Sequence, residues 1–210
     1  MVESRVTEAR QAAFWQARYE AEDAPWDLGQ PAPALLTWLK THPGDQRRVL
    51  VPGCGRGHDA LALAEAGYTV VAVDFAASAL DALRQASAAK GLSVSVHEAD
   101  LFDLDPARVG QFDLWFEHTC FCAIDPAERS RYVAQAARLL SPDGQLIGVF
   151  FTHGEAGGPP FDSRPEEIQR LFAQDFVQHE LVTTPHSVPK RRGKETWGHF
   201  TRRRPDGHHR

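Results

Sequence analysis

Segments typical of buried β-strands alternate with segments typical of helices from residue 48 onward, and this alternation constrains the fold more than any other feature. Strands joined through helices need right-handed crossovers, which predict an α/β fold with a mostly parallel sheet and helices on both faces. The predicted strands are Arg48–Pro52, Tyr68–Val73, Leu92–His97, Gln111–Phe116, Gln145–Phe151, Phe176–Val182 and Lys194–Arg202. The predicted helices are Thr7–Glu22, Pro33–Thr41, His58–Ala66, Ala76–Lys90, Pro126–Leu140 and Pro165–Ala173.

The length of 210 residues suits one domain. We expect a helical cap or lid at 1–45, an α/β core at 46–204 and a frayed tail at 205–210. No apolar run is long enough to span a membrane, the first residues lack the apolar segment of a secretory signal, and three cysteines are too few for a disulfide framework. These features predict a reduced, cytoplasmic protein without a membrane partner.

The formal charge of −5 is unevenly distributed, because the segment His186–Arg210 holds eight Lys/Arg against two acidic residues. A basic tail is one mark of nucleic-acid binding. A solvated final strand explains it equally simply, and the acidic remainder of the chain would repel phosphate. The sequence therefore predicts no nucleic-acid partner.

The first strand runs into a glycine-rich turn with Gly53, Gly55 and Gly57. Ligands of such sheets bind beyond the carboxyl ends of the strands. The turn fits neither the dinucleotide fingerprint, because its third glycine comes one residue early, nor a P-loop, because no Lys-Ser/Thr follows. Its G-x-G-x-G pattern is typical of class I methyltransferases, although a purely structural turn is a fair alternative.

Acidic residues follow the next two strands. Asp74, which ends the second strand before Phe75, can accept hydrogen bonds from ribose hydroxyls or cap the helix that begins near Ala76. Asp100 can accept from an adenine amino group, with Leu101 or Phe102 against the ring, or form a polar turn. Three such elements at successive strand ends favour the nucleoside interpretation.

The fourth strand runs into Glu117, His118 and Thr119, where the transferred group should point. His118 and Glu117 are candidates to orient or deprotonate a nucleophile, although a lone histidine is often structural. Cys120 and Cys122 lack the spacing of a zinc site and are expected to be small buried hydrophobic residues. We therefore expect no metal.

Aromatic residues before the first strand include Trp15, Tyr19 and Trp26. Such residues are usually core, but Trp15 and Trp26 can also close over a cation such as a sulfonium. Late in the chain, a glycine-proline cluster ending at Phe161 is a candidate for the substrate pocket. Arg191 is a candidate for anion binding or for a solvated position.

Several motifs together resemble the thiopurine methyltransferase-like family, and more closely its thiol and halide (thiocyanate) methyltransferase branch. The motifs are Trp15 with Trp26-Asp27-x-Gly29, VPGCGRGHD at 51–59, VDFA at 73–76, FCAIDP at 121–126, GGPPF at 157–161 and HSVPKRRGKE at 186–195. The resemblance implies a Rossmann-like class I methyltransferase with a seven-stranded sheet. It also implies S-adenosylmethionine as methyl donor, S-adenosylhomocysteine as product and a small soft nucleophile as acceptor.

Carried onto this chain, the resemblance implies three groups of site residues. The cofactor contacts are Trp15, Trp26, Gly53, Gly55, Gly57, Asp74, Phe75, Asp100, Leu101 and Glu117; the catalytic candidates are His118 and Glu117; the substrate pocket holds Tyr19, Thr119, Phe161 and Arg191. Plant members carry Trp at position 19, Tyr-Val at 118–119 and Tyr at 161. These departures surround the expected acceptor, which is left open among thiols, hydrosulfide, thiocyanate, halides and metalloid anions.

The expected reaction is in-line displacement at a sulfonium methyl group, in which the enzyme mainly positions the reactants. A halide needs no base, whereas a thiol with a pKa of about 8.5 is only slightly ionised at neutral pH, so His118 is more useful to a thiol. The alternatives are a methyltransferase of RNA or protein and a non-catalytic S-adenosylmethionine-binding regulator. The glycine spacing disfavours a dehydrogenase, and we expect a monomer or weak homodimer.

Overall fold

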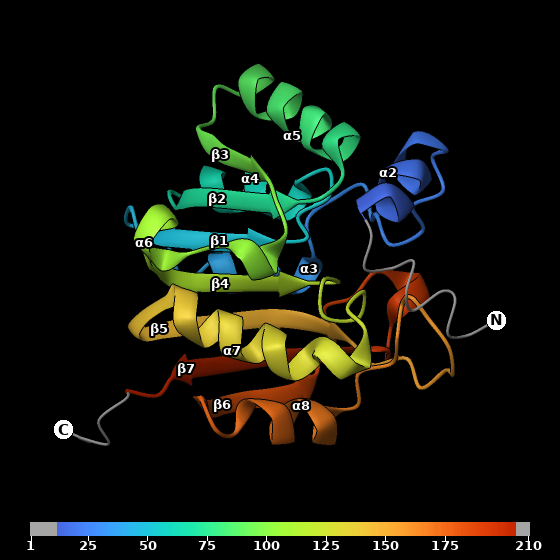
Figure 1. The fold of residues 1–210 in the computed structure, drawn as a ribbon, viewed down its shortest axis with the longest axis vertical. Coiled ribbons are helices and arrows are strands. Elements are labelled where there is room, and N and C mark those ends of the chain that lie inside the picture. Colours follow the sequence, from blue (N-terminus) through green and yellow to red (C-terminus); the bar gives the residue numbers. More distant parts are fainter. Residues whose placement is uncertain (1–11, 205–210) are drawn as a thin grey trace.

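A seven-stranded sheet forms the centre of the protein (Figure 1). The computed structural model describes residues 12–204. The strands are β1 (Arg48–Pro52), β2 (Thr69–Asp74), β3 (Val94–Glu98), β4 (Phe112–His118), β5 (Leu140–Phe151), β6 (Phe176–Thr183) and β7 (Glu195–Arg202). They lie in the order β3-β2-β1-β4-β5-β7-β6.

The sheet is mostly parallel, as predicted. All pairs from β3 to β5 are parallel, and only β7 runs antiparallel, to both β5 and β6. Strands covered on both faces read as continuous apolar runs, and four of the five residues of β1 are buried. The chain order reverses between β1 and β4, so the ligand site is expected where these strands end.

Helices cover both faces of the sheet (Figure 1). They are α2 (Ala12–Glu20), α3 (Pro33–Leu39), α4 (His58–Glu65), α5 (Ala77–Ala89), α6 (Pro106–Val109), α7 (Arg129–Leu139) and α8 (Pro165–Phe172), with short 3₁₀ turns η1 (Leu101–Asp103), η2 (Pro126–Glu128) and η3 (Pro189–Arg191). The predicted helix Thr7–Glu22 is observed from residue 12, and its first residues lie outside the described part. The expected tail at 205–210 also lies outside it.

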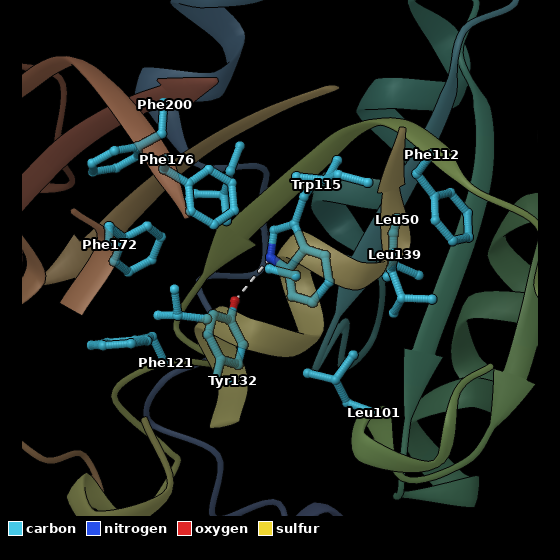
Figure 2. Packing of buried hydrophobic residues seen from close by; sticks show 14 of the residues in the cluster. Leu50, Leu101, Phe112, Trp115, Phe121, Tyr132, Leu139, Phe172, Phe176 and Phe200 are labelled. Atoms are coloured by element: carbon cyan, nitrogen blue, oxygen red, sulfur yellow. Dashed lines mark hydrogen bonds between the residues drawn. The ribbon is translucent and has the colours of Figure 1, made fainter. Parts of the chain in front are cut away.

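Two buried clusters fill the space between the sheet and the helices. One joins the sheet to α7 and α8 and is rich in aromatic residues, including Trp115, Tyr132 and Phe121 (Figure 2). Its Trp115 indole donates to the Tyr132 hydroxyl at 2.9 Å, which satisfies two polar groups in an apolar layer. The other joins the opposite face to α3, α4 and α5, with Val49 and Leu63 fully buried.

Strand β4 extends two residues beyond its predicted end at Phe116 and includes Glu117 and His118. Successive side chains of a strand point to opposite faces. Glu117 therefore points to the same face as Trp115, toward α7, whereas His118 points toward α4. The sequence prediction placed both residues in a loop, and this correction decides what each side chain can contact.

Two further differences concern short elements. The sequence prediction missed η1, α6 and η3, whose turns are only three or four residues long. Helix α2 lies beyond the carboxyl ends of β1 and β2 and is tied to the core by Gln16, whose side chain accepts from the Ser78 backbone N–H at 3.2 Å (Figure 1). No helix within residues 12–204 is long and apolar enough to cross a membrane.

Candidate active site

A cavity of about 320 Å³ lies at the carboxyl end of the sheet. The predicted site residues that line it are Trp15, Tyr19, Trp26, Gly53, Asp74, Phe75, Asp100 and Thr119. A smaller hollow adjoins it, and four residues line both: Tyr19, Trp26, Gly53 and Thr119. Two other predicted site residues, Gly55 and His118, line the smaller hollow and not the larger cavity. The structure thus brings together residues from the N-terminal segment and from four strand ends.

The glycine turn is bound to the end of β2 through Asp74. One carboxylate oxygen accepts from the Gly55 N–H at 2.8 Å, and the other accepts from the Ala76 N–H at 3.0 Å. Burial raises the pKa of Asp74 although the backbone donors oppose it. Asp74 therefore organises the turn and the start of α5, and it also faces the cavity, where its spare lone pairs can accept further hydrogen bonds.

The three glycines of the turn have left-handed backbones but different surroundings. A Cβ on Gly53 would lie 2.9 Å from the Cys120 sulfur, and one on Gly55 would lie 2.5 Å from the Tyr19 hydroxyl, both beside the cavity. A Cβ on Gly57 would instead lie 2.3 Å from Leu83 of α5. Gly57 therefore allows two helices to pack, and it lines neither hollow.

Three aromatic side chains form one wall of the cavity. The rings of Trp15 and Trp26 meet edge to face at 5.2 Å, as do those of Tyr19 and Trp26 at 5.6 Å. The Trp26 indole donates to the Tyr19 hydroxyl at 2.9 Å, and burial raises the pKa of Tyr19. The wall presents aromatic surface to the cavity, and aromatic faces attract cations.

In the part of the site that was predicted to hold adenine, one residue lies elsewhere than predicted. Asp100 lines the cavity, and its carboxylate accepts from the Phe102 N–H at 2.8 Å. Phe102 also lines the cavity, with the Arg131 guanidinium 4.2 Å above its ring. Leu101 is 7% exposed and belongs to the buried cluster instead. Of the two residues considered for the ring contact, Phe102 lines the cavity and Leu101 does not.

Glu117 is fully buried under the turn that follows β4 and lines neither hollow. Its carboxyl accepts from the Phe121 N–H at 2.8 Å and from the Tyr132 hydroxyl. Burial raises its pKa to about 7. Its position supports the turn rather than the cavity surface, and that turn carries Cys120 and Cys122 on the cavity wall.

His118 is surrounded by charged side chains. Its Nδ1 lies 2.6 Å from the Asp59 carboxylate, and its Nε2 lies 3.5 Å from the Arg191 guanidinium. Burial alone lowers the pKa of His118, but Asp59 outweighs it and the pKa is raised overall. Arg191 is itself buried, 3.3 Å from Glu195, and donates to the Trp26 carbonyl at 2.7 Å.

The glycine-proline segment closes the other side of the cavity, where Pro159 and Pro160 line it. The side chain of Phe161 is buried, and its N–H donates to the Cys122 carbonyl at 2.7 Å. Buried Arg129 donates to the Phe161 carbonyl at 3.3 Å and to Glu167 at 2.8 Å. The segment is therefore fixed to both α7 and the turn after β4.

Three contributions to the site were not predicted: Asp59, the cysteine pair as cavity lining, and the ion pair of Asp27 with Arg56 at 3.0 Å, which joins the Trp26 loop to the glycine turn. The two prolines lie in the glycine-proline cluster that was predicted to line the pocket, and they do line the cavity. Asp59 and Arg56 lie inside the VPGCGRGHD motif, which was the available signal. Within residues 12–204, no group of three or more His, Cys, Asp or Glu side chains could hold a metal ion.

Comparison with known proteins identifies the family. The family model described as thiopurine S-methyltransferase matches residues 10–203. The chain belongs to the thiopurine S-methyltransferase family. Membership confirms the resemblance drawn from the motifs, and the chain is an S-adenosylmethionine-dependent methyltransferase, as the sequence predicts.

Two relatives within this family come from Arabidopsis thaliana. Thiocyanate methyltransferase 1 is 35% identical over 192 residues, covering 89% of this chain and 83% of that protein. Probable thiol methyltransferase 2 is 32% identical over 200 residues, covering 93% and 88%. The solved structure of Burkholderia thailandensis 1,6-didemethyltoxoflavin-N1-methyltransferase with bound S-adenosylhomocysteine matches with a TM-score of 0.67 at 23% identity, covering 97% of this chain and 90% of that one. That likeness confirms the class I methyltransferase fold.

Proposed function

We propose that the protein transfers a methyl group from S-adenosylmethionine to a small thiol or to hydrosulfide. The observation that carries the choice of a thiol is His118, a buried imidazole paired with Asp59 at 2.6 Å beside the hollow that adjoins the cavity. A neutral thiol must lose a proton to become a nucleophile, and histidine is the side chain that most often accepts a proton in general base catalysis.

The cavity residues fit the donor. Asp74 offers carboxylate lone pairs for ribose hydroxyls, Asp100 and Phe102 offer an acceptor and a ring for adenine, and Trp15 and Trp26 offer aromatic surface for a sulfonium. When bound, the donor supplies a methyl group on a positively charged sulfur, which leaves without protonation. These assignments are proposals built on the positions of the side chains.

The size of the site supports a small acceptor. At about 320 Å³, the cavity lies at the low end of the range of roughly 300–1,000 Å³ for ligand sites, and the donor must share it. We place the acceptor where the two hollows meet at Thr119, next to both the donor cavity and the smaller hollow that His118 lines. At that position the residues that line the two hollows hold the donor and the acceptor in line and exclude water. This arrangement raises the effective concentration of the nucleophile.

The other predicted residues take supporting roles in this proposal. Glu117 positions the turn that carries Thr119, because its carboxyl accepts from the Phe121 N–H within that turn and from the Tyr132 hydroxyl of α7. Arg191 holds Trp26 through its backbone carbonyl and adds positive charge next to His118. Gly57 and Leu101 act through packing, and Phe161 through the position of the proline wall.

A second candidate is methylation of thiocyanate or a halide. It is favoured by the 35% identity to thiocyanate methyltransferase 1, a relative that the chain matches over most of its length. These anions need no base, so the two candidates differ in what they require of His118.

The test is production of S-adenosylhomocysteine by wild type and His118→Ala with a small thiol and with thiocyanate. The proposal expects thiol turnover to fall about 100-fold at neutral pH and thiocyanate turnover to change little, since general bases contribute about 10²–10⁴-fold. His179→Ala, on strand β6, is the matched control and should change neither. Equal losses with both acceptors would show that His118 is not a base, and turnover of thiocyanate alone would favour the second candidate.

A further inference from the structure

Asp59 lies on α4, directly behind His118. One of its carboxylate oxygens accepts from the Ala32 backbone N–H at 2.7 Å, and the other lies 2.6 Å from His118 Nδ1. The first contact fixes the carboxylate, because a backbone donor on a buried residue cannot turn away. The second fixes the imidazole, whose side chain is only 6% exposed.

We propose that Asp59 is a positioning residue that holds the proton of His118 on Nδ1 and so leaves a lone pair on Nε2 that can take the proton of the acceptor thiol. This inference rests on the proposed function and adds to it the residue that selects the tautomer. An ionised carboxylate can only accept, so the nitrogen that faces it must carry the hydrogen. The other nitrogen of a neutral imidazole then has a lone pair.

The other charged groups around His118 agree with this assignment. Arg191, from η3, lies 3.5 Å from Nε2, and Glu195, from β7, pairs with Arg191 at 3.3 Å. Glu117 precedes His118 on β4 but points to the opposite face. A guanidinium beside Nε2 disfavours a hydrogen there in the resting enzyme, whereas Asp59 raises the pKa of the imidazole and so favours its acceptance of a proton.

The proton and electron balance of the step is complete. The thiol S–H bond breaks and its proton goes to His118 Nε2, while the sulfur lone pair forms the new bond to the methyl carbon. The bond from that carbon to the donor sulfur breaks, and its electron pair stays on that sulfur, which becomes neutral. The imidazolium, stabilised by the Asp59 carboxylate, then returns its proton to solvent.

Asn at position 59 is a sharp probe because an amide has only one acceptor oxygen. The Ala32 N–H is a fixed donor, so the Asn oxygen must face it, and the amide NH₂ must then face His118 Nδ1. That contact forces the hydrogen onto Nε2 and removes its lone pair. The substitution therefore reverses the tautomer while it preserves the shape of the side chain.

The experiment compares wild type, Asp59→Asn and His118→Ala with 2-mercaptoethanol and with thiocyanate across pH. We expect Asp59→Asn to reduce kcat/KM for the thiol about 100-fold at neutral pH, and thiocyanate turnover and S-adenosylhomocysteine binding to change less than about threefold. The thiol defect should shrink as the pH approaches the pKa of the thiol itself. Asp113→Asn is the matched control, because Asp113 also accepts a backbone N–H, from Arg48 at 2.9 Å.

The outcomes separate the inference from the function on which it rests. A selective thiol defect in His118→Ala but not in Asp59→Asn would overturn the role of Asp59 alone. No selective defect in His118→Ala would overturn the base, and with it the proposed thiol chemistry. Equal losses with both acceptors in Asp59→Asn, or a thiol defect that does not respond to pH, would show that Asp59 only supports the fold. Nitrogen chemical shifts of His118 should show Nδ1 protonated in wild type and Nε2 protonated in Asp59→Asn.

Discussion

Replacing Glu117 with glutamine should change how the stability of the protein depends on pH. The Glu117 carboxyl is fully buried and bonded to the Phe121 N–H and the Tyr132 hydroxyl. Burial is the largest influence on it and raises its pKa from 4.5 to about 7, although both hydrogen bonds act in the opposite direction. Glutamine has nearly the same shape and no proton to lose.

The expected magnitude follows from linkage between protonation and folding. Between pH 4.5 and about 7 the folded chain holds a proton on Glu117 that the unfolded chain has lost. The stability contributed by this group is therefore fully present below pH 4.5 and is lost as the pH rises to about 7. Each pKa unit corresponds to about 1.4 kcal/mol, so the loss amounts to about 3 kcal/mol.

The assay is urea unfolding of wild type and Glu117→Gln, followed by tryptophan fluorescence from about pH 5 to about pH 8. The free energy of unfolding of the variant minus that of wild type should rise by most of that 3 kcal/mol across the window. Glu98→Gln, at an exposed position on β3, is the control and should show no such rise. A difference that stays constant within about 0.5 kcal/mol would refute the buried, proton-holding carboxyl.

Two further predictions concern stability. Gly57→Ala should lower the free energy of thermal unfolding by about 2–4 kcal/mol, because the new Cβ would lie 2.3 Å from Leu83 and φ is +79°. The control Gly91→Ala, with φ +65° and open space around the position, should lower it by about 1 kcal/mol. Equal losses in the two variants would contradict the packing argument. Arg129→Met should cost about 2–4 kcal/mol, because it leaves two loop carbonyls and a carboxylate without their donor, whereas the exposed control Arg84→Met should change stability by less than about 0.5 kcal/mol. A loss below about 1 kcal/mol in Arg129→Met would show that the proline segment is held without it.

Most of the fold could be predicted from local patterns. The first strand is observed with its predicted bounds, 48–52, and each of the other six predicted strands is present with one or both ends displaced by one to five residues. Short apolar runs and the glycines that follow helices are local signals, so they can be recognised without knowledge of the tertiary structure. Three-residue turns such as η1 have no comparable signal.

The candidate site was predictable in its parts but not in its connections. The glycine turn, Asp74 and Asp100 follow from motifs at strand ends, and the aromatic residues follow from the segment before the first strand. The structure places all of them on the two hollows except Gly57. The pair of Asp59 with His118 joins residues far apart in the chain, and no periodicity relates them. Such a contact depends on how α4 packs against the end of β4.

The sequence by itself determined the order of strands and helices, the place of the candidate site and the family, because periodicity, glycine turns and motifs are properties of neighbouring residues. Only the tertiary structure decided which of Glu117 and His118 lines a hollow of the candidate site. The two are adjacent in β4, and the pleat of an extended strand sends adjacent side chains to opposite faces of the sheet. Because β4 continues for two residues beyond Phe116, Glu117 points toward Tyr132 beneath the turn and His118 points toward Asp59 beside the smaller hollow.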